Sequence, residues 1–102
     1  MEDINQDHVE VEVTFLPTNA GGRSTPVFSG YRCQFFYDGE DRDVEQKYIN
    51  KEIVYPGETV KALIRFYFPE NVVGKLKSGK VFLLREGFKV IGYGQITKIF
   101  KN

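Results

Sequence analysis

The chain has 102 residues, of which 41% are apolar and 15% aromatic, and its 14 basic and 14 acidic residues give a formal net charge of zero. This length fits one domain with a single modest core, and the balanced charge excludes a global field that would attract nucleic acid or an anionic membrane. The single cysteine, Cys33, excludes an internal disulfide framework and a thiolate-rich metal site. Because the sequence has no basic-then-apolar signal segment and no apolar run of about 18 residues, we expect a soluble protein of the cytoplasm.

Strands are predicted where apolar and polar residues alternate along the chain. The polar start, MEDINQD (1–7), is expected to be a flexible tail, because it has nothing to bury. The next run, HVEVEVTF (8–15), places three valines and a phenylalanine on one face and two glutamates on the other. In YRCQFFY (31–37), alternation puts Cys33 and Phe35 on one face with the two tyrosines. Both runs have the pattern of half-buried strands.

The second half of the chain supplies the remaining strands. TVKALIRFYF (59–68) repeats the alternation and places Phe66 and Phe68 on the face of its aliphatic residues. VFLLRE (81–86) and GQITKIF (94–100) are two more short segments, which FKVIGY bridges, so about six or seven strands are expected in all.

Turn-forming residues separate these runs. Pairs such as Asp38-Gly39 and Pro56-Gly57 suit tight turns in which the glycine has a positive φ. No window of about 11 residues keeps an apolar period of 3.6, so we expect almost no helix. The sequence therefore predicts a single all-β domain over residues 8–102, an antiparallel barrel or sandwich that is closed or covered at its edges.

Few residues offer catalytic or metal-binding chemistry. His8, the only histidine, lies beside the predicted tail with nothing to hold it, which disfavours a nucleophilic relay. Cys33 is predicted to be a small buried apolar residue and not a reactive thiol. The acidic stretch DGEDRD (38–43) lacks the spacing of a calcium-binding loop and is interpreted as a solvated hairpin tip. We therefore predict no cofactor or metal site, and an enzyme is the last of the functional hypotheses.

One stretch carries a family resemblance. GGRSTPVFSGYRCQFFY (21–37) closely resembles the start of the third, C-terminal domain of elongation factor Tu, and the segments VEVTFLPTNAGG, IVYPGETVKALIRFYFP and VFLLREGFKVIGYGQITKIF are similar to its other parts. They come in the family's order over about residues 9–100. The resemblance implies a closed six-stranded antiparallel β-barrel, here as a stand-alone domain. The phosphate loop of the family's GTPase domain, G-x-x-x-x-G-K-[ST], is absent from the sequence, so nucleotide hydrolysis is not expected.

The resemblance also implies an interaction surface. Thr25 and Pro26 match a family segment that faces the GTPase domain, and Gln34 matches a glutamine at the same boundary. Exposed aromatic and arginine side chains beside an apolar patch are the usual anchors of an interface. The predicted protein-interaction residues are Arg23, Thr25, Phe28, Gln34 and Arg85. The alternative is that they are relics that hold the loop in place.

For two features of this region we prefer a structural interpretation over a binding role. Gly21-Gly22 is predicted to form a structural turn, because a β segment follows it where a phosphate loop would be followed by a helix. Arg23, Arg32 and Arg85 could form a basic patch, but the neighbouring acids favour internal ion pairs. These acids are Asp38, Glu40, Asp41, Asp43 and Glu86.

The preferred function is a non-catalytic protein-interaction module that docks on a partner of elongation factor Tu, or competes with the factor's own barrel for it. Such a protein partner would be a translation factor, a regulator or a toxin. The alternative is a translation-associated domain that binds tRNA or another RNA. The four acids in 38–43 disfavour it, as do Ser24 and Cys33, which replace a family histidine and proline. The sequence does not show whether the remaining cations converge: Lys47, Lys51, Lys61, Lys75, Lys77 and Lys80.

Overall fold

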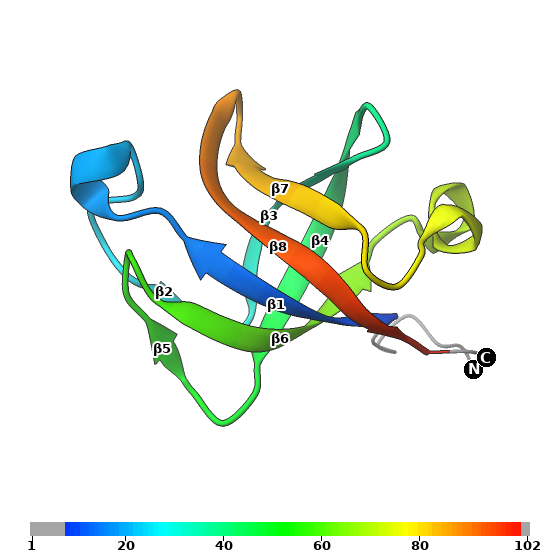
Figure 1. Ribbon diagram of the computed structural model, residues 1–102, viewed down its shortest axis with the longest axis horizontal. Helices are drawn as coiled ribbons and strands as arrows, with labels where there is room; N and C mark the ends of the chain where they lie inside the picture. Colours follow the sequence, from blue (N-terminus) through cyan, green and yellow to red (C-terminus); the bar gives the residue numbers. More distant parts are fainter. Residues whose placement is uncertain (1–7, 101–102) are drawn as a thin grey trace.

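Six antiparallel strands close into a barrel in the computed structural model, which describes residues 8–100 (Figure 1). In chain order the barrel strands are β1 (Val9–Phe15), β3 (Tyr31–Tyr37), β4 (Glu40–Tyr48), β6 (Thr59–Phe66), β7 (Val81–Glu86) and β8 (Lys89–Ile99). Around the barrel their order is β1-β6-β4-β3-β7-β8, and pairing of β8 with β1 closes it. The predicted all-β class and the closed six-stranded antiparallel barrel are confirmed. The predicted tail, residues 1–7, lies outside the described residues.

The remaining elements are short. β2 (Val27–Phe28) and β5 (Ile53–Val54) form a separate two-stranded sheet. Three single-turn 3₁₀ helices lie in the connections: η1 (Thr18–Ala20), η2 (Pro69–Asn71) and η3 (Val73–Lys75). Within residues 8–100 there is no α-helix, and no helix is long and apolar enough to cross a membrane.

The core is formed by the alternate residues that face the barrel interior. The three valines of β1 are 0% exposed, as the alternation predicted. Phe35 lies at the centre, stacked on Phe82 with 4.2 Å between ring centroids and meeting Phe66 edge-on at 4.9 Å. Aromatic pairs in these geometries stabilise a core beyond the area that they bury. The rings therefore join β3, β6 and β7 through one cluster.

Two predictions at the ends of strands are wrong. Phe68 is 60% exposed, because β6 ends at Phe66 and Pro69 starts η2, which breaks the alternation two residues early. His8 is held in place, since it is only 6% exposed and its Nδ1 accepts a hydrogen bond of 3.0 Å from the Phe66 N–H. Its own backbone N–H donates to the Ile64 carbonyl at 2.8 Å, so the pairing of β1 with β6 continues one residue before Val9.

Strand β4 was not predicted. The stretch interpreted as a hairpin tip, 38–43, is a turn only at Asp38 and Gly39, because Glu40 already begins the strand. Its inward positions include the fully buried Gln46, and its acids face solvent, so the apolar alternation is too weak to see.

The segments FKVIGY and GQITKIF form one continuous strand, β8. Gly94 does not interrupt it, because this glycine is needed for close contact with neighbouring groups. A Cβ added there would lie 2.6 Å from the Glu12 carbonyl oxygen and 2.5 Å from the Phe82 ring. The two glycines of IGYGQ therefore mark close packing within a strand.

Candidate interaction surface

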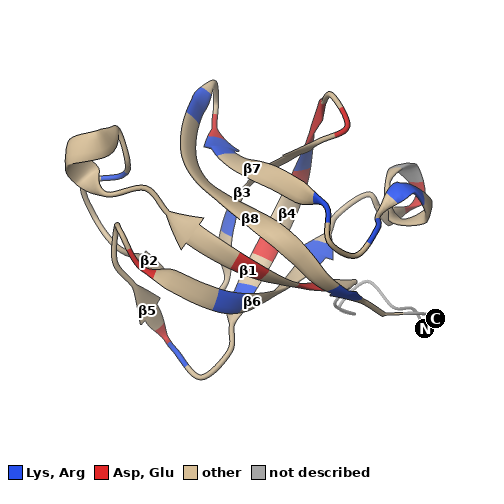
Figure 2. Ribbon diagram, in the orientation of Figure 1, with Lys and Arg blue, Asp and Glu red and all other residues tan. Residues whose placement is uncertain are grey.

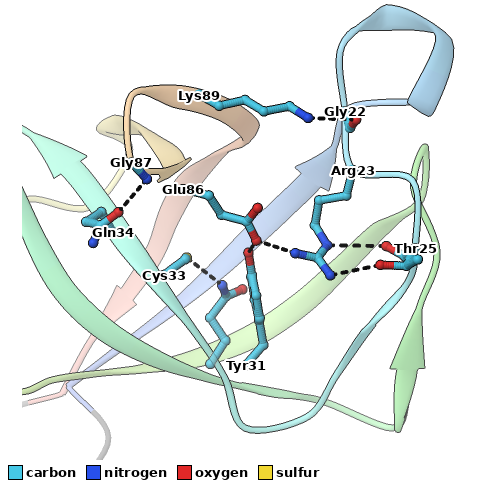
Figure 3. Close-up of polar contacts among 10 residues, drawn as sticks. Gly22, Arg23, Thr25, Tyr31, Cys33, Gln34, Glu86, Gly87 and Lys89 are labelled. Carbon is cyan, nitrogen blue, oxygen red and sulfur yellow. Dashed lines mark hydrogen bonds and ion pairs between the residues drawn. The ribbon is translucent and has the colours of Figure 1, made fainter.

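The loop after η1 is fixed by its two glycines. Gly21 has a φ of +92°, a left-handed conformation that favours glycine. Gly22 is buried, and a Cβ added there would lie 2.0 Å from the Leu16 carbonyl oxygen. Its N–H donates to the Pro17 carbonyl at 2.9 Å. These contacts confirm the predicted structural turn, which delivers the next residue, Arg23, toward the end of β7 (Figure 3).

Arg23 belongs to a polar network that ties this loop to the barrel (Figure 3). Its guanidinium forms an ion pair with Glu86, the last residue of β7, and donates to the Thr25 carbonyl at 3.2 Å and hydroxyl at 3.0 Å. The Tyr31 hydroxyl donates to the same carboxylate oxygen of Glu86. Burial, and then this hydrogen bond, raises the pKa of Tyr31 well above its ordinary value, so the hydroxyl stays protonated as a donor. Arg23 thus fixes the conformation of its own loop through Thr25 and ties this loop to the end of β7 through Glu86.

Gln34 and Arg85 lie next to each other on paired strands, β3 and β7. The Gln34 side-chain oxygen accepts a hydrogen bond of 3.2 Å from the Gly87 N–H, at the turn between β7 and β8. The Arg85 guanidinium lies 4.7 Å from the ring centroid of Phe36 and 5.8 Å from that of Phe88. It also forms an ion pair of 3.6 Å with a strand β4 residue, Asp41. The two predicted residues therefore shape one hairpin tip and the surface beside it.

Phe28 lies on a different element from the other four predicted site residues. It belongs to the small sheet, where it pairs with Ile53, and it is 58% exposed. Tyr55, which follows β5, is 51% exposed. The structure thus divides the predicted site into an Arg23–Thr25 loop, a Gln34–Arg85 pair and a separate Phe28.

The predicted ion pairing of the arginines holds for two of the three. Arg23 pairs with Glu86, and Arg85 pairs with Asp41. Arg32 is different, because its guanidinium lies over the Tyr67 ring at 5.3 Å and forms no ion pair with any residue in 8–100.

An exposed apolar surface, which the sequence analysis missed, surrounds Arg85. We define the β7 face as Phe36, Val81, Leu83, Arg85, Phe88 and Tyr93. Leu83 pairs with Phe36 on one side and with Tyr93 on the other, so the three lie in one row across β3, β7 and β8. Exposure reaches 71% at Val81, 49% at Tyr93 and 93% at Phe88. The signal was present in VFLLRE, which is apolar on both faces of the strand where a half-buried strand would have one polar face.

Three of the lysines whose location was open converge on a groove at one end of this face. We define the lysine groove as the hollow of about 490 Å³ lined by Tyr37, Asp38, Lys75, Lys77, Lys80 and Val81. Figure 2 shows the corresponding basic segments in η3 and in the connection that leads to β7. Val81 belongs to both the groove and the β7 face. The two surfaces are therefore continuous.

The buried cysteine offers little nucleophilic chemistry. Cys33 is 7% exposed, and its sulfur accepts a hydrogen bond of 3.2 Å from the side-chain amide of Gln46. Burial raises the pKa of this thiol to about 12, so it is protonated near neutral pH. Burial of Cys33 was predicted and is confirmed. Within residues 8–100, no group of three or more His, Cys, Asp or Glu side chains is arranged to hold a metal ion.

Comparison with protein families agrees with this architecture. The family model described as the elongation factor Tu C-terminal domain matches residues 4–100, a range that includes every strand of the barrel. The match also covers the Arg23 loop, the hairpin between β7 and β8, and the lysine groove. The resemblance seen in the sequence is thereby confirmed, and the chain belongs to the family of elongation factor Tu C-terminal domains.

Proposed function

We propose that this chain is a non-catalytic protein-interaction module that uses the β7 face. It docks on a partner of elongation factor Tu, or competes with the factor's own C-terminal barrel for that partner. Family membership supports the link to the translation factor. The observation that carries the proposal is the exposure of Phe88, 93%, beside the stacked Arg85.

The chemistry of the β7 face suits a protein partner. Aromatic and arginine side chains contribute most of the binding energy in protein interfaces, and exposed apolar residues that adjoin one another mark such sites. The Arg85 guanidinium lies near the rings of both Phe36 and Phe88, so its charge is close to apolar groups. A guanidinium ordered in this way loses little side-chain entropy when a partner covers it.

The predicted residues Arg23, Thr25 and Gln34 support this surface by positioning it. Gln34 binds the backbone of Gly87, next to Phe88, and Arg23 holds the carboxylate that precedes this glycine. Both contacts restrict the hairpin tip. A partner therefore meets a preformed surface, which lowers the cost of binding. Phe28 contributes only if the partner also reaches the small sheet.

The test is capture of binding proteins from native lysate with the immobilised chain, in the presence of nuclease. Phe88→Ala and Arg85→Ala are each expected to reduce capture by about tenfold or more, as for anchor residues that cost about 2 kcal/mol. Phe68→Ala is the matched control, because it removes an equally large ring that is 60% exposed elsewhere on the barrel. Equal capture by the wild type and both β7-face variants would refute the proposal.

RNA binding is the second candidate, and convergence of the three lysines favours it. Lysine ammonium groups bind phosphates as point charges. Asp38, which lines the same groove, disfavours RNA binding, as do the exposed acids of the adjoining strand β4. Added salt distinguishes the two functions, since RNA binding would weaken steeply and binding to the apolar β7 face would weaken little.

A further inference from the structure

We infer that the lysine groove binds an acidic segment of a protein, in which carboxylate side chains lie beside an apolar one. We further infer that the same partner covers the β7 face, and this second step rests on the proposed function. Binding at the groove itself depends only on the contacts and charges of the groove.

The backbone that carries the lysines is fixed on two sides. The Tyr37 hydroxyl, from the end of β3, donates a hydrogen bond of 3.0 Å to the Lys75 carbonyl. Ile96 of β8 accepts from the Gly79 N–H at 2.7 Å and donates to the Lys80 carbonyl at 2.9 Å. The Lys80 N–H donates to the Lys77 carbonyl at 3.2 Å, which closes a turn. The three ammonium groups therefore extend from a backbone that is ordered before any ligand arrives.

The charges of the groove are unbalanced in a protein whose formal net charge is zero. Several cations elsewhere have acidic partners, in pairs such as Arg23–Glu86, Lys51–Glu58 and Arg65–Glu45. In contrast, Lys75, Lys77 and Lys80 make no ion pair with any described residue, and Asp38 is the one acid that lines the groove. Three positive charges against one negative charge at a hollow attract an anionic ligand.

The surroundings favour an acidic protein segment over a phosphate backbone. Val81 is 71% exposed on the rim, so the groove offers an apolar contact that phosphates cannot use. The ring that lines the groove, Tyr37, is 7% exposed and its hydroxyl is already bonded, so it gives no face for stacking a base. Glu40 and Asp41, which follow Asp38 closely in the chain, are exposed and would repel a long polyanion that extended over them. A short segment avoids them.

The probe is a synthetic peptide of alternating glutamate and leucine residues, titrated into ¹⁵N-labelled protein and followed by NMR. We expect chemical-shift changes at residues 75–81 that saturate, and a Kd that rises about fivefold or more in the Lys75→Gln/Lys80→Gln variant. The control is Lys61→Gln/Lys98→Gln, which changes the net charge equally at exposed sites outside the groove. Its Kd is expected to change by less than about twofold.

Three outcomes would overturn the inference. One is the absence of saturable shifts at the groove, and another is equal loss of affinity in the two double variants, which would mean that only net charge matters. The third is tighter binding at the groove of single-stranded oligouridine than of the peptide, which would assign the lysines to nucleic acid. A peptide with glutamine in place of glutamate should leave the spectrum unchanged. None of these measurements involves Phe88. A negative result at the groove would therefore not decide the outcome of the capture experiment, which tests the β7 face.

Discussion

The alternation in β6 offers a strict test of the fold, because the sequence placed Phe66 and Phe68 on the same face and the structure separates them. Phe66 is 2% exposed, with its ring 4.9 Å from that of Phe35 and 6.0 Å from that of His8. Truncating a buried phenylalanine to alanine costs about 3 to 5 kcal/mol, from lost burial and from the cavity that remains. A domain of this size has a total stability of about 5 to 15 kcal/mol, so Phe66→Ala removes a large part of it.

The assay is urea unfolding followed by circular dichroism, with thermal unfolding in parallel. Phe66→Ala should lower the free energy of unfolding by about 3 kcal/mol or more and the Tm by about 12 °C or more. Phe68→Ala removes the same ring from a side chain that is 60% exposed, and it should cost less than about 1 kcal/mol. A loss below about 1 kcal/mol for Phe66→Ala, or equal losses for both variants, would show that the facing of β6 is wrong.

A loop glycine, the buried cysteine and two positioning residues can each be tested by substitution. Gly22→Ala should destabilise the fold by about 2 kcal/mol or more in urea unfolding, since its Cβ would lie 2.0 Å from a backbone oxygen. Gly74→Ala is the control and should cost almost nothing, because the space around Gly74 is open. Equal effects of the two substitutions would contradict the geometry. The folded-state pKa of Cys33 is raised to about 12, so its contribution to stability is complete below about pH 8.5 and is lost as the pH rises toward 12. Between about pH 8 and 10, the free energy of unfolding should therefore fall less steeply with rising pH in Cys33→Ala than in the wild type. Parallel pH dependence in the two proteins would disprove the raised pKa of Cys33. Arg23→Ala and Gln34→Ala should keep the fold, judged by circular dichroism, but weaken partner capture by about fivefold, and unchanged capture by both would remove their positioning role.

The parts of the fold that the sequence predicted are those in which alternation and packing agree. In β1, every second residue is an apolar side chain that the barrel buries, so the periodicity gave both the strand and its facing. In β4 the inward residue Gln46 is polar and the first positions carry acids, so local pattern gave no strand, although pairing with β3 and β6 forms one. The conformation of β4 is therefore determined by its pairing with neighbouring strands and not by its own sequence pattern.

The candidate site was predicted less completely, because its contacts join residues far apart in the chain. Arg23 and Glu86 are 63 positions apart, and only closure of the barrel brings them together around Tyr31. Convergence of the lysines likewise depends on the course of the connection between β6 and β7, which has no periodic signal. Family resemblance named Gln34 and Arg85, which do lie together, but it gave no reason to select Phe88.

The most direct test of the interaction role is photo-crosslinking from position 88. The chain is produced with p-benzoylphenylalanine in place of Phe88, and a second version carries the same group in place of Tyr55, which is 51% exposed on another part of the surface. After irradiation in native lysate, we predict a defined protein adduct from position 88 and none from position 55. Excess C-terminal domain of elongation factor Tu should reduce this adduct. No protein adduct from position 88, or the same adducts from both positions, would contradict the proposed role of the β7 face.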